Sequence, residues 1–157
     1  MEKLFRYNWQ VRDDWFTWCE DVPEEELLRR RVGGRGSILY TLFHVVQEER
    51  SWIHFLKTQQ DFAEPSFDEY ASLEEVKALS NQYHKEVETF VVSWVDEMEI
   101  RSITATNSDG QSAVFRHGEI MRHLIAHEIH HVGQLSVWAR ELGRKPVTSN
   151  FIFRRLF

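Results

Sequence analysis

Residues 123–134 constrain the fold more than any other part of this chain. They hold four of the eight histidines, and two of these, His127 and His131, are four residues apart. On a helix, residues at this spacing stack one turn above the other on the same face. A helical wheel places the pair in or beside the apolar stripe of residues 118–142, so both rings should point inward. Burying two imidazoles together costs free energy unless something binds them.

Two interpretations of this pair are open. Inward histidines are often ordinary core residues that hydrogen bonds satisfy. Two imidazoles one turn apart can instead bind one metal ion and leave room for a third ligand. The pairing favours the metal site, with His123 and His130 at its rim on the side of Gln134.

A zinc protease is a further possibility, because residues 127–131 match the pattern H-E-x-x-H. Those enzymes usually take their third ligand from downstream of the motif. No histidine follows His131, and the only acidic residue after it is Glu141, on the same helix. The short match is weak evidence, and we disfavour this class.

His44 is the expected third ligand. It lies in the helical segment 38–57, which follows a glycine-rich break and has Ser37 as a natural N-cap. A narrow polar stripe runs along this segment: Ser37, Thr41, His44, Glu48 and Ser51. A polar stripe can be a solvated face, but an inward histidine pair elsewhere needs a partner, so we expect the stripe to meet it. The remaining histidines are expected away from the site: His54 and His84 at the surface, and His117 in a solvated loop.

Four long helical segments are predicted, at about residues 3–20, 38–57, 72–95 and 118–142. Residues 102–115 alternate and contain Asp-Gly, which predicts a small hairpin or extended pair. The expected fold is all-α, a single domain over residues 1–157. It is an antiparallel four-helix bundle with one long crossover and the extended segment outside it.

The charge balance argues against a nucleic-acid partner. The formal net charge is −6, whereas binding to nucleic acid needs a basic face. Two short basic clusters, at residues 29–35 and 154–155, are interpreted as solvated loop and terminal charges. No apolar run suggests a leader peptide or a membrane span, and the one cysteine, Cys19, is interpreted as a buried structural thiol. A cytoplasmic protein is expected.

A homodimer is also expected, because aromatic residues surround the first helix. They are spread over more than one face: Trp9, Trp15, Phe16 and Trp18. One bundle interior buries a single stripe of a helix, so the others would form an exposed patch unless a partner covers them.

The chain resembles the DinB-like family of four-helix-bundle metalloproteins over nearly its whole length. The motifs that carry the resemblance follow in order: Tyr7, Asn8, Trp9 and Arg12; Val22 to Glu25; Ser37 to His44 with Glu49 and Trp52; and His127, His130, His131, Gly133 and Gln134. One departure is Val132, where members often have arginine.

The resemblance implies a divalent metal ion, zinc or nickel, held by His44, His127 and His131. Relatives in the wider superfamily are transferases and isomerases that use thiols such as bacillithiol or mycothiol, and members commonly form dimers. The implied activity is the transfer of a low-molecular-weight thiol to an electrophile. The alternative is a non-catalytic metal-binding protein with a structural or stress-sensing role.

Three further residues are candidate catalytic groups. Glu48, one turn from His44, could act as a general base or orient that ligand, although a plain surface carboxylate is equally consistent with the pattern. His130 and Gln134 flank the metal-facing side and could orient a substrate, although a helix-packing role is at least as consistent with the pattern for both.

Overall fold

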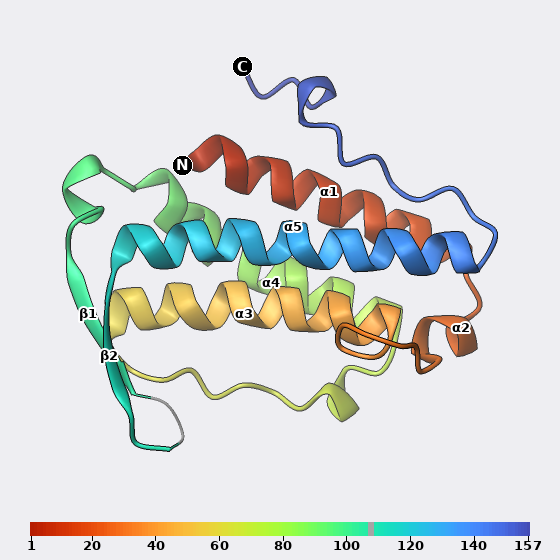
Figure 1. Ribbon diagram of the computed structural model, residues 1–157, viewed down its shortest axis with the longest axis horizontal. Coiled ribbons are helices and arrows are strands. Elements are labelled where there is room, and N and C mark those ends of the chain that lie inside the picture. The colour runs from red at the N-terminus through yellow and green to blue at the C-terminus, as the bar shows by residue number, and fades with distance from the viewer. Residues whose placement is uncertain (107–108) are drawn as a thin grey trace.

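The computed structural model describes residues 1–106 and 109–157 and is mostly helical (Figure 1). Its long helices are α1 (Glu2–Glu20), α3 (Ile38–Thr58), α4 (Leu73–Val92) and α5 (His117–Glu141). The short helix α2 (Glu24–Leu28) follows α1, and the strands β1 (Ser102–Thr106) and β2 (Ser112–Arg116) lie between α4 and α5. Three single 3-10 turns complete the fold: η1 (Phe67–Glu69), η2 (Asp96–Met98) and η3 (Phe151–Phe153). The predicted helical bundle with a hairpin between its last two long helices is confirmed.

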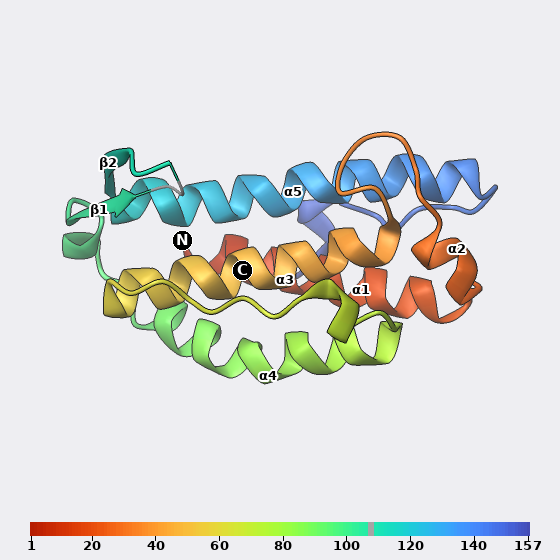
Figure 2. The same ribbon diagram turned by 90° about the horizontal axis from the view of Figure 1, so that it is seen from below.

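The directions of the helices differ from a wholly antiparallel bundle. α1 and α5 run one way and α3 and α4 the other, as Figures 1 and 2 show. α3 packs against both α4 and α5, and α1 packs against the same two helices. Residues 59–72 return along the length of the bundle before α4 begins, so α3 and α4 are parallel. The long crossover is confirmed, but the expectation of antiparallel helices throughout is wrong for two packed pairs, α3 with α4 and α1 with α5.

The helix starts follow the capping signals in the sequence. The Ser37 hydroxyl accepts a hydrogen bond of 3.1 Å from the Tyr40 N–H at the start of α3. At α4, Ser72 and Glu75 form a capping box in which each side chain accepts from the other residue's backbone. Both caps satisfy N–H groups that have no partner inside the helix.

The hairpin lies outside the bundle, at the end where α4 stops and α5 starts (Figure 1). Its two antiparallel strands pair from Ser102 with Arg116 to Thr106 with Ser112. Gly110, in the predicted Asp-Gly turn, has a φ of +76°, which a residue with a side chain rarely adopts. Residues 107–108 of the predicted extended segment lie outside the described residues.

A buried ion cluster crosses the core between three helices. The Arg12 guanidinium on α1 donates to both Glu128 oxygens on α5, at 2.9 and 2.6 Å, and to Glu49 on α3 at 2.9 Å. Trp9 donates to the second Glu49 oxygen at 2.8 Å. All three charged side chains are at most 8% exposed. Glu49, which interrupts the apolar face of α3, therefore ties that helix to α1.

The C-terminal tail covers the outer face of α1. Tyr7 donates to the Ser149 carbonyl at 2.7 Å, and Trp18 donates to the Lys145 carbonyl at 3.0 Å. Trp9, Trp15 and Phe16 are all buried, and Trp18 is half-buried. The premise of the homodimer prediction is therefore wrong: the chain itself covers the second face of α1. Homodimerisation stays a prediction without this support.

Several charged and polar residues lie differently from the sequence expectation. His117 is the first residue of α5 and is buried, because residues 99–101 cover it; its N–H donates to the Arg101 carbonyl at 2.9 Å. It is therefore not a solvated loop residue. Arg31 and Arg154 are not solvated charges either, since Arg31 pairs with Glu26 and Arg154 pairs with Asp14.

The buried thiol predicted for Cys19 is confirmed. Cys19 is fully buried, and burial raises the pKa of its thiol to about 12, which fits a structural residue. Within the described ranges, no helix is both long and apolar enough to cross a membrane.

Replacing Arg12 with Met should destabilise the fold strongly. The change leaves the Glu49 and Glu128 carboxylates buried without a cation, which typically costs about 3–5 kcal/mol of the free energy of unfolding. The measurement is urea unfolding followed by circular dichroism. The control is Arg6→Met, which breaks the exposed ion pair with Glu2 and should change stability little. Equal effects of the two variants would contradict a central role for the buried cluster.

Candidate metal centre

Three histidines from two helices meet at one point between α3 and α5. The Nε2 atom of His127 lies 3.1 Å from Nε2 of His44 and 3.1 Å from Nε2 of His131. One nitrogen from each of the three rings lies within 4.8 Å of the other two. The expected convergence of these three residues is confirmed, and the polar stripe of α3 faces α5 rather than solvent.

The donor set fits a divalent metal ion. An ion with tetrahedral geometry and metal–nitrogen distances of about 2.0–2.1 Å holds its ligand nitrogens about 3.3 Å apart. Two of the three nitrogen–nitrogen separations are 3.1 Å, close to this spacing, and the third is at most 4.8 Å. Imidazole suits zinc, nickel and other late transition metals, so the cluster could bind such an ion, but the residues do not select one.

The rings are poised to stay neutral, as metal ligands must be. Burial lowers the pKa of His44 to about 3, helped by the charge of Arg35. Burial also lowers the pKa of His127 to about 4, and that of His131 below its ordinary value. His131 is buried while His44 and His127 are half-buried, so the cluster is partly accessible.

Gln134 holds the His131 ring in place. Its Oε1 lies 2.8 Å from His131 Nδ1, so that nitrogen carries the proton and donates, which leaves Nε2 free to face the cluster. The Gln134 amide then donates to His130 Nε2 at 2.8 Å. His130 and His123 are exposed on α5, as the wheel predicted. Gln134 therefore bonds directly to His131, a candidate metal-binding residue. His130 bonds to Gln134 and not to the cluster itself.

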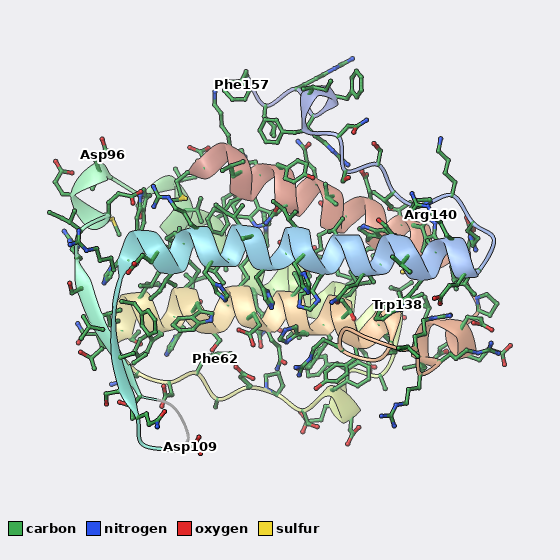
Figure 3. The ribbon with its side chains drawn as sticks, in the orientation of Figure 1. Phe62, Asp96, Asp109, Trp138, Arg140 and Phe157 are labelled. Atoms are coloured by element: carbon green, nitrogen blue, oxygen red, sulfur yellow. The ribbon has the colours of Figure 1, made fainter. Side chains whose placement is uncertain are left out.

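The glycine-rich loop before α3 closes over this hydrogen bond. A Cβ atom on Gly34 would lie 2.5 Å from Gln134 Oε1 and 3.0 Å from the Trp138 ring, so only glycine fits there. Trp138 donates to the Val32 carbonyl at 3.3 Å and points from α5 toward this loop (Figure 3). The loop thereby helps to fix Gln134.

Glu48 lies beside His44 on the side of the hairpin. Its Oε1 is 3.6 Å from His44 Nδ1, too far for a direct hydrogen bond. Burial and the charge of Glu64 raise the pKa of the Glu48 carboxyl above its ordinary value. Glu48 is therefore placed where it could orient His44 or exchange a proton.

Glu128 is turned away from the histidine cluster. Both of its oxygens are bonded to Arg12 in the core, next to Glu49. A zinc protease of the H-E-x-x-H type needs this carboxylate beside the metal as its base. The structure therefore agrees with rejecting that class.

An apolar cleft opens toward the hairpin. It has a volume of about 510 Å³, and its aromatic wall is made of Trp52, Phe55, Phe62 and Phe115. Phe62 lies on the crossover below α3 (Figure 3). The Trp52 ring is 6.4 Å from the His123 ring, which is 5.6 Å from the ring of His127. The rings of Trp52 and His123 therefore lie between the cleft and the cluster.

Sequence reasoning missed two features of the surroundings. Arg35 is exposed, as expected of a solvated loop charge, but its nearness to the cluster histidines, whose pKa values it lowers, was not foreseen. The Arg12 cluster behind α5 was not foreseen either. Glu49 on an apolar face was its one signal, because a carboxylate there needs a buried cation.

The family model described as the DinB family matches residues 1–155. This chain belongs to the DinB family. The family includes metal-dependent enzymes. A relative named uncharacterized protein YizA, from Bacillus subtilis (strain 168), is 46% identical over 156 residues, which is 99% of this chain and 96% of that protein. Val132, the one departure noted from the family pattern, is buried among apolar core residues.

Replacing His131 with Ala should abolish metal binding while the bundle stays folded. The change removes one of three donors, whereas the aromatic and aliphatic core is untouched. Metal content per chain after saturation with zinc or nickel should fall to near zero, and the circular dichroism spectrum should stay helical. The matched control is His123→Ala, which removes an exposed histidine of the same helix and should retain the metal. Unchanged metal content in His131→Ala would contradict the assignment.

Metal-free protein should lose stability as the pH falls from about 6.5 toward 4. In the unfolded chain the histidines bind protons below their ordinary pKa of 6.5, but folded His44 and His127 resist protonation down to about 3 and 4. The unfolded chain therefore binds more protons than the folded one between about pH 6.5 and pH 4. The stability that the neutral histidines contribute is complete above pH 6.5 and decreases as the pH falls through this range. Urea unfolding with a chelator at pH 7.5 and pH 5 should show a smaller loss in His44→Gln than in the wild type. An equal loss in both proteins would refute this origin.

Proposed function

We propose that this chain is a metal-dependent transferase that moves a low-molecular-weight thiol onto an electrophilic substrate. The observation that carries the proposal is a three-histidine cluster that is partly exposed. Three protein donors leave one position for a further ligand, which is typical of catalytic rather than structural zinc sites. His44, His127 and His131 would hold the ion.

The metal supplies one kind of chemistry here. When bound, a divalent ion lowers the pKa of a thiol at the open position, so that a thiolate is available at neutral pH. In the proposed reaction the sulfur forms a bond to the electrophilic carbon with its own electron pair. The leaving group departs with the electron pair of the bond that breaks, and the thiol proton goes to Glu48 and then to water.

The residues around the cluster divide the remaining tasks. Glu48 is the proposed proton acceptor, since its raised pKa brings it closer to neutral pH. Gln134 holds His131, and His130 supports Gln134, so both act as positioning residues. The aromatic cleft formed by Trp52, Phe55 and Phe62 would hold the apolar part of the electrophile.

The alternative is a metal site that only stabilises the bundle. One observation favours it: the cluster joins α3 to α5, so a bound ion would link these two helices. In that case chelation would lower the melting temperature strongly, and no thiol would be consumed.

The test is a thiol-transfer assay on zinc- and nickel-loaded protein. Bacillithiol, mycothiol and cysteine are each offered with 1-chloro-2,4-dinitrobenzene, and loss of thiol is followed with and without chelator. We expect transfer that depends on the metal and is lost in His131→Ala. Full stability loss on chelation with no transfer for any thiol would favour the structural alternative.

Glu48→Gln separates the two possible roles of that carboxylate. A general base typically contributes about 10²–10⁴-fold to the rate, so kcat should fall by that order at unchanged metal content. If Glu48 only orients His44, metal affinity should instead fall by about 10–100-fold, with kcat restored at saturating metal. Glu69→Gln, an equal charge change on the exposed crossover, is the control and should alter neither quantity.

A further inference from the structure

A basic pocket lies at the start of α3, on the other side of the histidine cluster from the aromatic cleft. Its volume is about 510 Å³, and the loop 28–37, apart from Arg29 and Val32, lines it together with Tyr40. Three arginines line it, Arg30, Arg31 and Arg35, and none of the lining residues is acidic. The N-terminus of α3 adds the positive end of a long helix.

Two of these arginines keep their charge available for a ligand. Arg31 is neutralised by Glu26 at 2.9 Å and faces Glu141 at 3.5 Å. Arg35 donates to the Tyr40 hydroxyl at 3.1 Å and lies 5.1 Å from the centre of that ring, which leaves its charge uncompensated. Over the described ranges 1–106 and 109–157, no carboxylate lies within ion-pair distance of Arg30 or Arg35. Both are exposed, in a chain whose net charge is −6.

The pocket is close to the reacting groups. Tyr40 is one helical turn before His44 on α3, a rise of roughly 6 Å. Gly34 touches Gln134, which holds His131. The charge of Arg35 also reaches His44 and His127, whose pKa values it lowers.

We propose that this pocket binds a carboxylate or phosphate group of the small molecule that reacts at the histidine cluster, with Arg35 as the main contact and Arg30 as the second. A guanidinium offers planar paired donors that match either group, and Tyr40 holds the Arg35 side chain over the pocket. The inference rests on the proposed thiol transfer and narrows its substrate to an anionic thiol. The acidic end of that thiol lies at the start of α3 and its sulfur at the cluster.

Binding measurements test this without any turnover. Zinc-loaded protein is titrated calorimetrically with mercaptosuccinate and with neutral 2-mercaptoethanol at an ionic strength of about 0.15 M, at which exposed charges more than about 8 Å apart are largely screened. Arg35→Gln should weaken mercaptosuccinate binding roughly tenfold or more, the loss expected for a hydrogen bond to a charged group. Binding of 2-mercaptoethanol should not change. Arg35→Lys, which keeps the charge but loses the paired donors, should show a smaller loss.

The matched control is Arg29→Gln, the same charge change in the same loop. Arg29 pairs with Glu26 and does not line the pocket, so mercaptosuccinate affinity should change less than about twofold at screened, exposed positions. An equal loss in Arg29→Gln, or an equal loss for the neutral thiol in Arg35→Gln, would overturn the proposal. No preference for mercaptosuccinate in the wild type would overturn it too.

A metal-free arm separates this inference from the metal function. Chelated protein is titrated with succinate and with inorganic phosphate, and the stronger binder shows which acidic group the pocket takes. Binding that needs Arg35 supports the pocket even if zinc does not bind. If the protein binds zinc and transfers thiol but no anion binding depends on Arg35, the proposal for the basic pocket is overturned. The proposed thiol transfer would then still stand.

Discussion

The bonded cluster of Arg12, Glu49 and Glu128 is the interaction on which the rest of the structure depends. A buried carboxylate is costly unless a cation meets it with good hydrogen-bond geometry, so neither α3 nor α5 can bury its glutamate without α1. Arg12 therefore specifies how the two helices lie relative to each other. Because His44 is on α3 and His127 and His131 are on α5, that same relationship brings the histidines together.

The histidine cluster follows from this arrangement because the glutamates and the histidines lie on different faces of α3 and α5. On α5, Glu128 points to the core and the adjacent His127 points to the seam with α3, since neighbouring residues on a helix differ by about 100°. On α3, Glu49 lies five residues after His44, so the two side chains differ by about 140° around the helix and lie on different faces. On each helix, one face carries the glutamate that bonds to Arg12, and the adjacent face carries the histidines. The histidine cluster can therefore be partly exposed while the ion cluster stays buried.

The seam between α3 and α5 has two chemically different ends. Toward the hairpin, the rings of Trp52 and Phe115 make an apolar cleft; toward the start of α3, Arg30 and Arg35 make a basic pocket. The histidine cluster lies between them. The centre is therefore flanked by an apolar surface on one side and a basic surface on the other. The segments that build these ends, the hairpin and the glycine-rich loop, lie outside the bundle proper.

The sequence by itself determined the local features of this protein. The periodic segments, the caps at Ser37 and Ser72, the inward pair His127 and His131 and the polar stripe around His44 are all short-range patterns, and the structure bears them out. Their spacing on the helices follows from the chain geometry alone. The three candidate ligands could be named for that reason, since an inward pair needs a third partner.

Only the tertiary structure decided which residues from different helices and loops contact one another. The parallel course of α3 and α4, the tail over α1, the burial of His117 and the Arg12 cluster all join residues far apart in the chain. So do the contact of Gly34 with Gln134 and the reach of Arg35 to the cluster. Contacts of this kind depend on how the helices pack. The spacing of apolar and polar residues along the sequence shows which face of a helix is buried, but not which residues of another helix lie against it.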